Sequence, residues 1–209
     1  MSARTDHAPA QLDLYDAKGQ RKYLTLDERA RFFAAAERAE RATRTFCYVL
    51  AYTGCRISEA VALTADRVDV EAGTVVFETL KKRRPAHHRA VPVPASVLDA
   101  LDLVHDIRQL QRRGRARGVR LWRFSRTTAW RRVMAVMREA GLHGPHATPK
   151  GLRHGFGVAA VQSGIPLNLV QKWLGHAQLS TTAIYADAVG AEEQAIASRM
   201  WARYEFSDR

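Results

Sequence analysis

Three basic side chains share one face of an expected helix over residues 150–162. Lys150, Arg153 and His154 recur at spacings of three and four residues, with apolar residues on the opposite face, so the three can point the same way from a buried support. Tyr185 follows downstream. Cations stabilise the charge of a phosphoryl transition state, and a tyrosine hydroxyl can act as a nucleophile. This combination suggests a site that binds a phosphate group and attacks it.

A second arginine in an apolar context is the best candidate to complete such a site. Arg56 lies in the segment TGCRISEA, and both Arg56 and Arg153 are expected near helix N-termini, where backbone N–H groups also bind anions. The planar guanidinium binds phosphate through two hydrogen bonds and stays protonated. Glu59 is expected to brace Arg56 or its helix. Because the ordinary pKa of tyrosine is about 10, we expect the cations and His176 to assist Tyr185.

The composition of the whole chain favours a polyanionic partner. The 209 residues carry a formal net charge of +12, which is typical of proteins that bind nucleic acid. No apolar window is long enough for a transmembrane helix, and the N-terminus lacks the apolar core of a secretory signal. The two cysteines indicate reduced thiols, so we expect a cytoplasmic protein without contact to a membrane.

The elements that must position these residues are mainly helical. A capping box of Thr25 and Glu28 predicts the start of the first helix, and Gly54 predicts the end of the second. Ser58 is expected to cap a short helix, and Trp130 is among the apolar residues of a later one. The sequence predicts helices over residues 26–40, 43–52, 58–63, 95–111, 127–140, 150–162 and 190–204, and strands over residues 67–70, 73–80 and 89–93. The expected fold class is therefore α+β, mainly α-helical, with a small antiparallel three-stranded sheet.

Three segments of the chain, TGCRISEA, LRHGF and LGHAQLSTTAIYA, resemble the catalytic domain of the tyrosine recombinase, or phage integrase, family. The resemblance covers about residues 24–189. It combines an arginine with a glutamate three residues later, an Arg-His pair after a helix start, a Leu-Gly-His segment and a tyrosine nine residues after that histidine. It implies the tyrosine recombinase catalytic-domain fold. It also implies a site-specific recombinase that cleaves and rejoins DNA without metal or ATP, in integration, excision or inversion.

The resemblance also implies a role for each matching residue of the phosphate site. Arg56 and Arg153 match the two arginines that clamp the scissile phosphate. His176 matches the histidine that hydrogen-bonds this phosphate and assists proton transfer. Tyr185 matches the nucleophile, which forms a 3′-phosphotyrosyl intermediate and releases a 5′-hydroxyl group.

Relatives carry a general-acid lysine at the tip of a β-hairpin, which the resemblance places at Lys81 or Lys82 here. Lys81 is favoured because it directly follows the expected strand. Lys150 stands where relatives usually have a histidine, so a hydrogen-bond donor is kept and a group that titrates near neutrality is lost. Glu59 and His154 are expected to support the site, since no chemical step requires them.

Two basic segments are then expected to contact the DNA backbone. One is the hairpin tip, with Lys82, Arg83 and Arg84. The other is a glycine-broken loop over residues 111–124, whose arginines are Arg112, Arg113, Arg115, Arg117, Arg120 and Arg123. The first four of these are the expected contacts. Such contacts position a duplex and make affinity depend on salt, but they do not choose a sequence. The alternative for the loop is that it serves solubility.

The expected organisation is one catalytic domain over residues 23–209, with residues 1–22 as a flexible tail and a C-terminal helix over about residues 190–204. An N-terminal core-binding domain, which most relatives carry, is not expected in this chain. The resemblance implies double-stranded DNA as partner, a homo-tetramer on DNA and a monomer when free. No cofactor is expected, and His143 and His146 lack the further ligands that a metal site requires.

Two other functions are consistent with parts of the sequence. A type IB topoisomerase uses a similar set of arginines, lysine, histidine and tyrosine, but it relaxes supercoils without exchanging partners. A non-catalytic helix-turn-helix protein would account for the segment VAAVQSGIPLNLVQKWLGH, with Gly164 in the turn, and for the positive charge. That second interpretation leaves the spacing of Arg56, Lys81 and Tyr185 unexplained.

Overall fold

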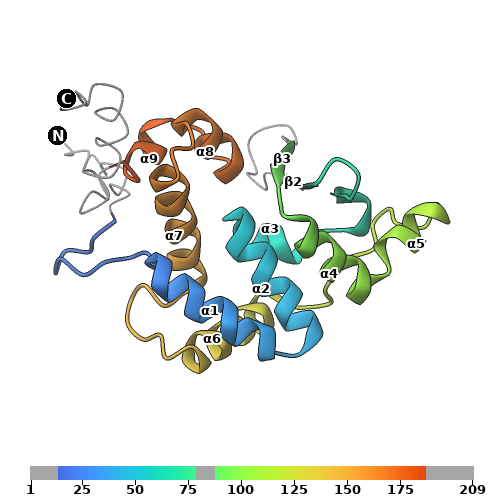
Figure 1. Cartoon of the computed structure of the whole chain (residues 1–209), viewed down its shortest axis with the longest axis horizontal. Coiled ribbons are helices and arrows are strands. Elements are labelled where there is room, and N and C mark those ends of the chain that lie inside the picture. The colour runs from blue at the N-terminus through green and yellow to red at the C-terminus, as the bar shows by residue number, and fades with distance from the viewer. Residues whose placement is uncertain (1–13, 79–87, 187–209) are drawn as a thin grey trace, which may run out of the picture.

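Helices, with one small antiparallel sheet at one side of them, make up the described part of the chain, residues 14–78 and 88–186 (Figure 1). This computed structural model confirms the expected α+β class with a three-stranded sheet. The expected helix over residues 190–204 and the hairpin tip, residues 79–87, lie outside the described residues. Within the described ranges, no helix combines the length and the apolar character needed to cross a membrane.

The elements follow the predicted order along the chain. The helices are α1 Leu26–Arg38, α2 Arg41–Thr53, α3 Ile57–Val61, α4 Ala95–His105, α5 Ile107–Arg112, α6 Arg126–Glu139, α7 Pro149–Gln162, α8 Leu167–Leu174 and α9 Ser180–Ala183, with a 3-10 turn at Ala65–Arg67. The strands are β1 Val68–Asp69, β2 Thr74–Glu78 and β3 His88–Pro92. β1 is shorter than expected, β3 has the expected length, and each strand begins within a residue of its predicted start.

Local capping chemistry sets several of the helix boundaries. The capping box of Thr25 and Glu28 is formed at the start of α1, and Gly54 ends α2 with a φ of 60°. The prediction for α3 was wrong, because Arg56 rather than Ser58 is its N-cap residue. The single helix expected over 95–111 is divided at Asp106, which adopts a φ of 53° and ends α4. A non-glycine residue rarely adopts this left-handed conformation, so hydrophobic periodicity alone did not reveal the break.

The sheet presents one face to the main core. The strand order is β1-β2-β3, all antiparallel, with Val75 opposite Val91 and Phe77 opposite Arg89. These four residues are buried, and their neighbours along the strands are more exposed, as the two-residue period of a strand requires. An arginine therefore lies on the core-facing side of β3.

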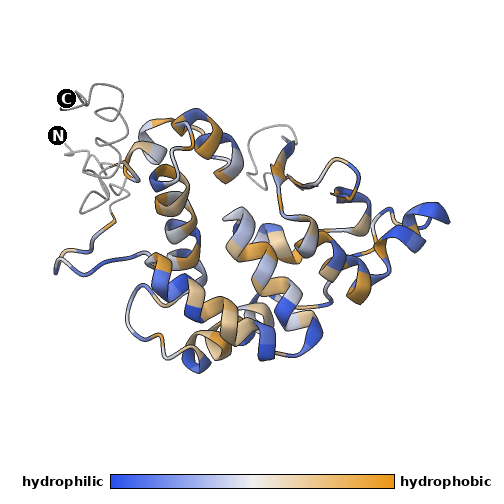
Figure 2. Ribbon diagram, viewed as in Figure 1, coloured by the Kyte–Doolittle hydropathy of each residue, from blue (hydrophilic) through white to orange (hydrophobic). Residues whose placement is uncertain are grey.

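The main core lies between the sheet and helices α1, α2, α4, α6 and α7. Phe32, Phe46 and Trp122 are among its fully buried side chains, and Trp122 packs edge-on against Phe46. The indole N–H of Trp122 donates to the hydroxyl of Thr45, so the one polar atom of this large side chain is satisfied. Apolar colour concentrates on helices in the middle of the molecule, whereas α5 projects as a hydrophilic end (Figure 2).

A second apolar cluster joins the start of the described chain to α7, α8 and Tyr185. Leu14 is buried in it, so residues 14–22, expected to belong to a flexible tail, fold back onto the domain. Arg21 forms a salt bridge with Glu28, and His146 lies 3.1 Å from the same carboxylate. These contacts hold the segment before α1 against the loop between α6 and α7.

Candidate active site

A cavity of about 620 Å³ gathers the side chains that the sequence singles out for chemistry. It is lined by residues at the start of α3, on α6, at the start of α7, and after α8 and α9; α8 and α9 lie together at one end of α7 (Figure 1). The predicted site residues in its wall are Arg56, Lys150, Arg153, His154, His176 and Tyr185. Segments about a hundred residues apart in the chain thus converge on one site. Lys81 falls outside the described residues.

Arg56 is held by the buried carboxylate of Glu59. The backbone N–H of Arg56 donates to Glu59 at 2.8 Å, and its guanidinium donates to the other carboxylate oxygen at 2.9 Å. Burial on its own raises the pKa of Glu59, but hydrogen bonds and charge from Arg89, together with Arg56, outweigh it and hold that pKa below its ordinary value. Glu59 is therefore an anion at neutral pH that holds the backbone N–H and the guanidinium of Arg56 in place.

Arg89 is a site residue that the sequence interpretation missed. Its guanidinium donates to both oxygens of Glu59, at 3.2 and 2.6 Å, and its Nε donates to the carbonyl of Trp173 at 2.8 Å. The side chains of Arg89 and Glu59 are each 1% exposed. Arg89 shares the strand parity of Val91 and Val93, which are buried, and this pattern was the available signal that it points inward. It links the sheet, the start of α3 and the end of α8.

Arg153 is buried and held by two backbone carbonyl groups. Its Nη1 donates to Gly54 at 2.7 Å and its Nη2 donates to Leu174 at 2.9 Å. Burial and, next, the charge of Arg56 lower the pKa of Arg153 to about 10, so it is still a cation at neutral pH. Two fixed bonds orient the guanidinium, and within the described ranges its other N–H groups have no protein acceptor. This is the arrangement that an anion in the cavity requires.

His176 follows α8 directly after Gly175, which ends that helix with a φ of 68°. Its Nδ1 lies 2.9 Å from the hydroxyl of Thr182, and its ring stacks on Tyr185 with an interplanar angle of 18°. Burial, followed by the charges of Arg153 and Arg56, lowers the pKa of His176 to about 3. The imidazole is therefore neutral at physiological pH and can donate a hydrogen bond without adding charge.

Tyr185 is almost fully enclosed, at 2% exposure. Its ring lies on Gly157, where a Cβ atom would come within 2.6 Å of the ring carbons. Its hydroxyl lies 3.2 Å from Nδ1 of His154, which is also buried. Burial raises the pKa of Tyr185, although the charges of Arg153 and Arg56 oppose this effect. The tyrosine is thus protonated and held by α7.

The outer wall of the cavity combines a lysine with an exposed tryptophan. Lys150, in the first turn of α7, is exposed, and Arg126 and Trp130 of α6 face the same cavity. Trp130, one of the apolar residues of the helix expected over residues 127–140, is 47% exposed. Hydrophobicity alone does not separate a core tryptophan from one beside a cationic cavity, because aromatic residues serve in both places.

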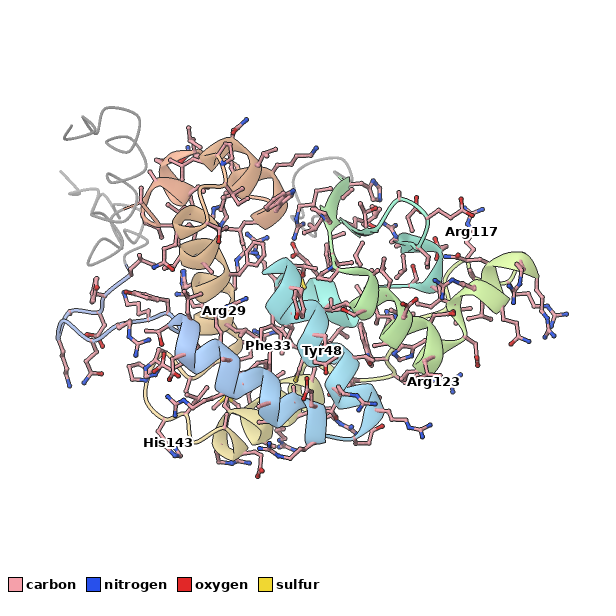
Figure 3. All side chains as sticks on the ribbon, viewed as in Figure 1. Arg29, Phe33, Tyr48, Arg117, Arg123 and His143 are labelled. Carbon is pink, nitrogen blue, oxygen red and sulfur yellow. The ribbon has the colours of Figure 1, made fainter. Side chains whose placement is uncertain are left out.

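The basic loop lies away from this cavity. Arg112 belongs to the last turn of α5, and Arg113, Arg115 and Arg117 follow it, all exposed. Arg117 lies on the side of the molecule opposite α7 (Figure 3). Arg112 and Arg117 line a groove together with Asp66, Asp69 and Glu71, so their charge is partly balanced. Lys82, Arg83 and Arg84, on the hairpin tip, fall outside the described residues.

Comparisons with known proteins identify a family for this chain. Residues 22–191 match the model of the phage integrase family. The chain is 34% identical over 184 residues to tyrosine recombinase XerD of Mycobacterium leprae, covering 78% of this chain and 56% of that protein. It is 29% identical over 172 residues to tyrosine recombinase XerA of Pyrococcus furiosus, covering 78% of this chain and 56% of the relative. The chain therefore spans about half the length of the curated relatives it matches.

Solved structures show the same fold. A crystal structure of XerA recombinase superimposes with a TM-score of 0.67 at 26% identity, covering 88% of this chain and 65% of that one. XerH site-specific recombinase bound to its difH substrate gives a TM-score of 0.66 at 22% identity, covering 90% of this chain and 59% of that one. At this second level of identity the likeness concerns the fold alone.

Proposed function

Because the chain belongs to the phage integrase family, we propose that it forms the catalytic domain of a site-specific recombinase acting on double-stranded DNA. In this proposal the domain extends over residues 23–209, and the enzyme cleaves and rejoins DNA through a 3′-phosphotyrosyl intermediate. The observation that carries the proposal is the convergence of Arg56, Arg153 and Tyr185 on one cavity from distant parts of the chain.

The reaction divides among the residues of the cavity according to their chemistry. Arg56 and Arg153 bind the non-bridging oxygens of the scissile phosphate and stabilise the charge that spreads over them in the transition state. His176 donates a further hydrogen bond to the phosphate. Tyr185 attacks phosphorus, and the bond to the 5′-oxygen breaks. The covalent linkage conserves the energy of the phosphodiester, so religation needs no nucleotide hydrolysis.

The hairpin lysine completes the reaction by protonating the leaving 5′-oxygen, and Lys81 is the favoured residue for this role. Lys150 adds a cation at the cavity mouth in place of the histidine that relatives usually carry. Lys82, Arg83 and Arg84 of the hairpin tip and the arginines after α5 are the proposed backbone contacts. In this proposal the assembled form is a homo-tetramer on DNA, and the free chain is a monomer.

The positions of the catalytic residues argue against a simple helix-turn-helix role for α7 and α8. The turn at Gly164 has the expected geometry, with a φ of 75°. However, Arg153 on α7 and His176 after α8 both face the cavity, so the two helices support a reaction site. A binding module gives no reason for a buried tyrosine beside two clamped arginines.

The test is covalent capture on a suicide substrate that carries a nick next to the cleavage point. The wild-type chain should form a protein–DNA adduct, because the nicked fragment diffuses away after attack. Tyr185→Phe should form no adduct and should still bind the same duplex in a mobility-shift assay. An adduct formed by Tyr185→Phe would show that another residue is the nucleophile, and binding without any wild-type adduct would favour the binding module.

A further inference from the structure

We propose that His154 is a further catalytic residue, the group that accepts the proton of the Tyr185 hydroxyl as the tyrosine attacks phosphorus. The proposal rests on the proposed function, since it assigns one step of that reaction. The sequence pattern placed His154 only as a support beside Arg153. Its contact with the reacting atom is what assigns it a chemical step.

The geometry of α7 holds the tyrosine hydroxyl against this histidine. Nδ1 of His154 lies 3.2 Å from the Tyr185 hydroxyl, within reach of a proton transfer. Gly157, three residues later on the same helix face, provides the flat surface on which the tyrosine ring lies. A Cβ atom at position 157 would displace the ring, because it would come within 2.6 Å of the ring carbons. One helix face thus fixes both the ring and the proton acceptor.

The other cavity residues are less well placed to take this proton. His176 uses its Nδ1 for Thr182. Its ring is nearly parallel to the tyrosine ring, with the ring centroids 6.2 Å apart, and among the described residues it makes no hydrogen bond to the tyrosine hydroxyl. Lys150, which occupies the position usually filled by histidine, is an ammonium group with no lone pair. His154 lies one helical turn after Lys150, on the same face. Among the described residues, His154 is the one whose side chain is hydrogen-bonded to the tyrosine hydroxyl.

The protonation state of His154 suits an acceptor that acts only with substrate bound. Burial, followed by the charges of Lys150 and Arg153, lowers the pKa of His154 to about 4, so its imidazole is neutral in the free protein. Its Nε2 is buried and has no hydrogen-bond partner among the described residues. Buried polar atoms are seldom left unpaired. A positive charge on His154, close to Lys150 and Arg153, would be costly without a nearby anion. A phosphate in the cavity supplies that anion and offsets the two neighbouring cations.

The charged and titratable groups around His154 come from every element of the cavity. They are Lys22 before α1, Arg56 at α3, Arg126 on α6, Lys150 and Arg153 on α7, His176 after α8 and Tyr185 after α9. All three residues that lower the pKa of His154 by their charge are cations. Phosphate binding therefore raises the basicity of His154 rather than lowering it.

The step balances in atoms and charge. The bond between the Tyr185 oxygen and phosphorus forms while the bond from phosphorus to the 5′-oxygen breaks. The tyrosine proton moves to Nδ1 of His154, and the hairpin lysine supplies a proton to the leaving oxygen. Religation reverses these transfers, so His154 returns its proton when the phosphotyrosine bond breaks.

The experiment measures single-turnover adduct formation on the nicked duplex. His154→Asn and His154→Gln are compared with His143→Gln, which alters an exposed histidine that does not line the cavity (Figure 3). Each chain is made with tyrosine or with difluorotyrosine at position 185, whose hydroxyl ionises more readily. We expect the His154 variants to cleave about 100-fold more slowly or worse, while binding DNA normally, and difluorotyrosine to recover much of the loss. His143→Gln should cleave like the wild type.

Two results would overturn the proposal. One is near-normal cleavage by a His154 variant, and the other is a slow variant whose rate difluorotyrosine leaves unchanged. If both variants fail to fold, nitrogen-15 NMR of the wild-type imidazoles decides. A proton on Nε2 with an accepting Nδ1 supports the assignment, and a proton on Nδ1 excludes it. Absence of any adduct from the wild type would refute the proposed function instead.

Discussion

Replacing Arg89 by methionine tests the buried salt bridge beneath Arg56, the arginine proposed to bind phosphate. The substitution removes two hydrogen bonds to Glu59 and one to the carbonyl of Trp173, and it keeps an apolar side chain of comparable length. Glu59 then remains as a buried carboxylate with Arg56 as its cationic partner. Removing one partner of a buried pair typically costs about 3–5 kcal/mol in the free energy of unfolding. For a domain of ordinary stability, about 5–15 kcal/mol, this loss is large.

The way the stability of Arg89→Met changes with pH is a second, independent test of this salt bridge. In the wild type the pKa of Glu59 is below its unfolded value, so the stabilisation is present above the unfolded pKa, about 4.3, and is lost as pH falls through the folded pKa. Without Arg89, burial dominates and raises the pKa of Glu59 above its unfolded value. Arg89→Met should therefore regain stability as pH falls from neutrality towards the unfolded pKa, whereas the wild type should not.

Urea denaturation followed by circular dichroism measures both effects. Glu59→Gln and the double variant Glu59→Gln/Arg89→Met complete a double-mutant cycle, in which the double variant should lose less than the sum of the single losses. Arg89→Lys is the matched control, because it keeps the positive charge but not the bidentate salt bridge to Glu59. A loss below about 1 kcal/mol in Arg89→Met, the value of an exposed pair, would refute the reasoning. A variant whose stability, like that of the wild type, does not rise as pH falls from neutrality would also refute it.

Two further predictions concern the contact between Gly157 and the Tyr185 ring, and the basic loop. Gly157→Ala gains up to about 1 kcal/mol of helix propensity, but its Cβ meets the Tyr185 ring. We therefore expect adduct formation to fall sharply while DNA binding persists; cleavage at the wild-type rate would show that the ring does not need this surface. Replacing Arg112 and Arg113 together by glutamine should reduce the slope of log affinity against log salt by about 2 if both contact phosphates. An unchanged slope, measured by fluorescence anisotropy, would assign the loop to solubility.

Short-range chemistry explains why much of the fold was predictable from sequence. The capping box at Thr25, the glycine at position 54 and the alternation in β2 each act through neighbouring residues, so their signals are visible in the chain. The set around Arg56 and Arg153 was predictable because its residue types and spacing are unusual together. Their convergence on one cavity follows from the fold.

Two of the features that the sequence did not reveal depend on long-range packing, and one is a local exception. The inward position of Arg89 requires Glu59, thirty residues earlier, and the carbonyl of Trp173 on another element. The break at Asp106 is an exception to the usual backbone preference of an aspartate. The docking of Leu14 depends on a surface formed by α7 and α8. For Arg89 and Leu14 the determining partner lies far away in the chain, where local patterns carry no information.

The two carbonyl groups that hold Arg153 come from the ends of helices. Gly54 is the C-cap residue of α2 and Leu174 is the last residue of α8, so both oxygens lack a partner within their own helix. The guanidinium supplies these missing bonds and places a positive charge at the negative ends of two helix dipoles. Active-site residues often reduce the stability of a protein in exchange for activity. At Arg153 the two roles coincide, because the residue that would bind substrate also joins two helix ends, and an inactive variant at this position would lose both.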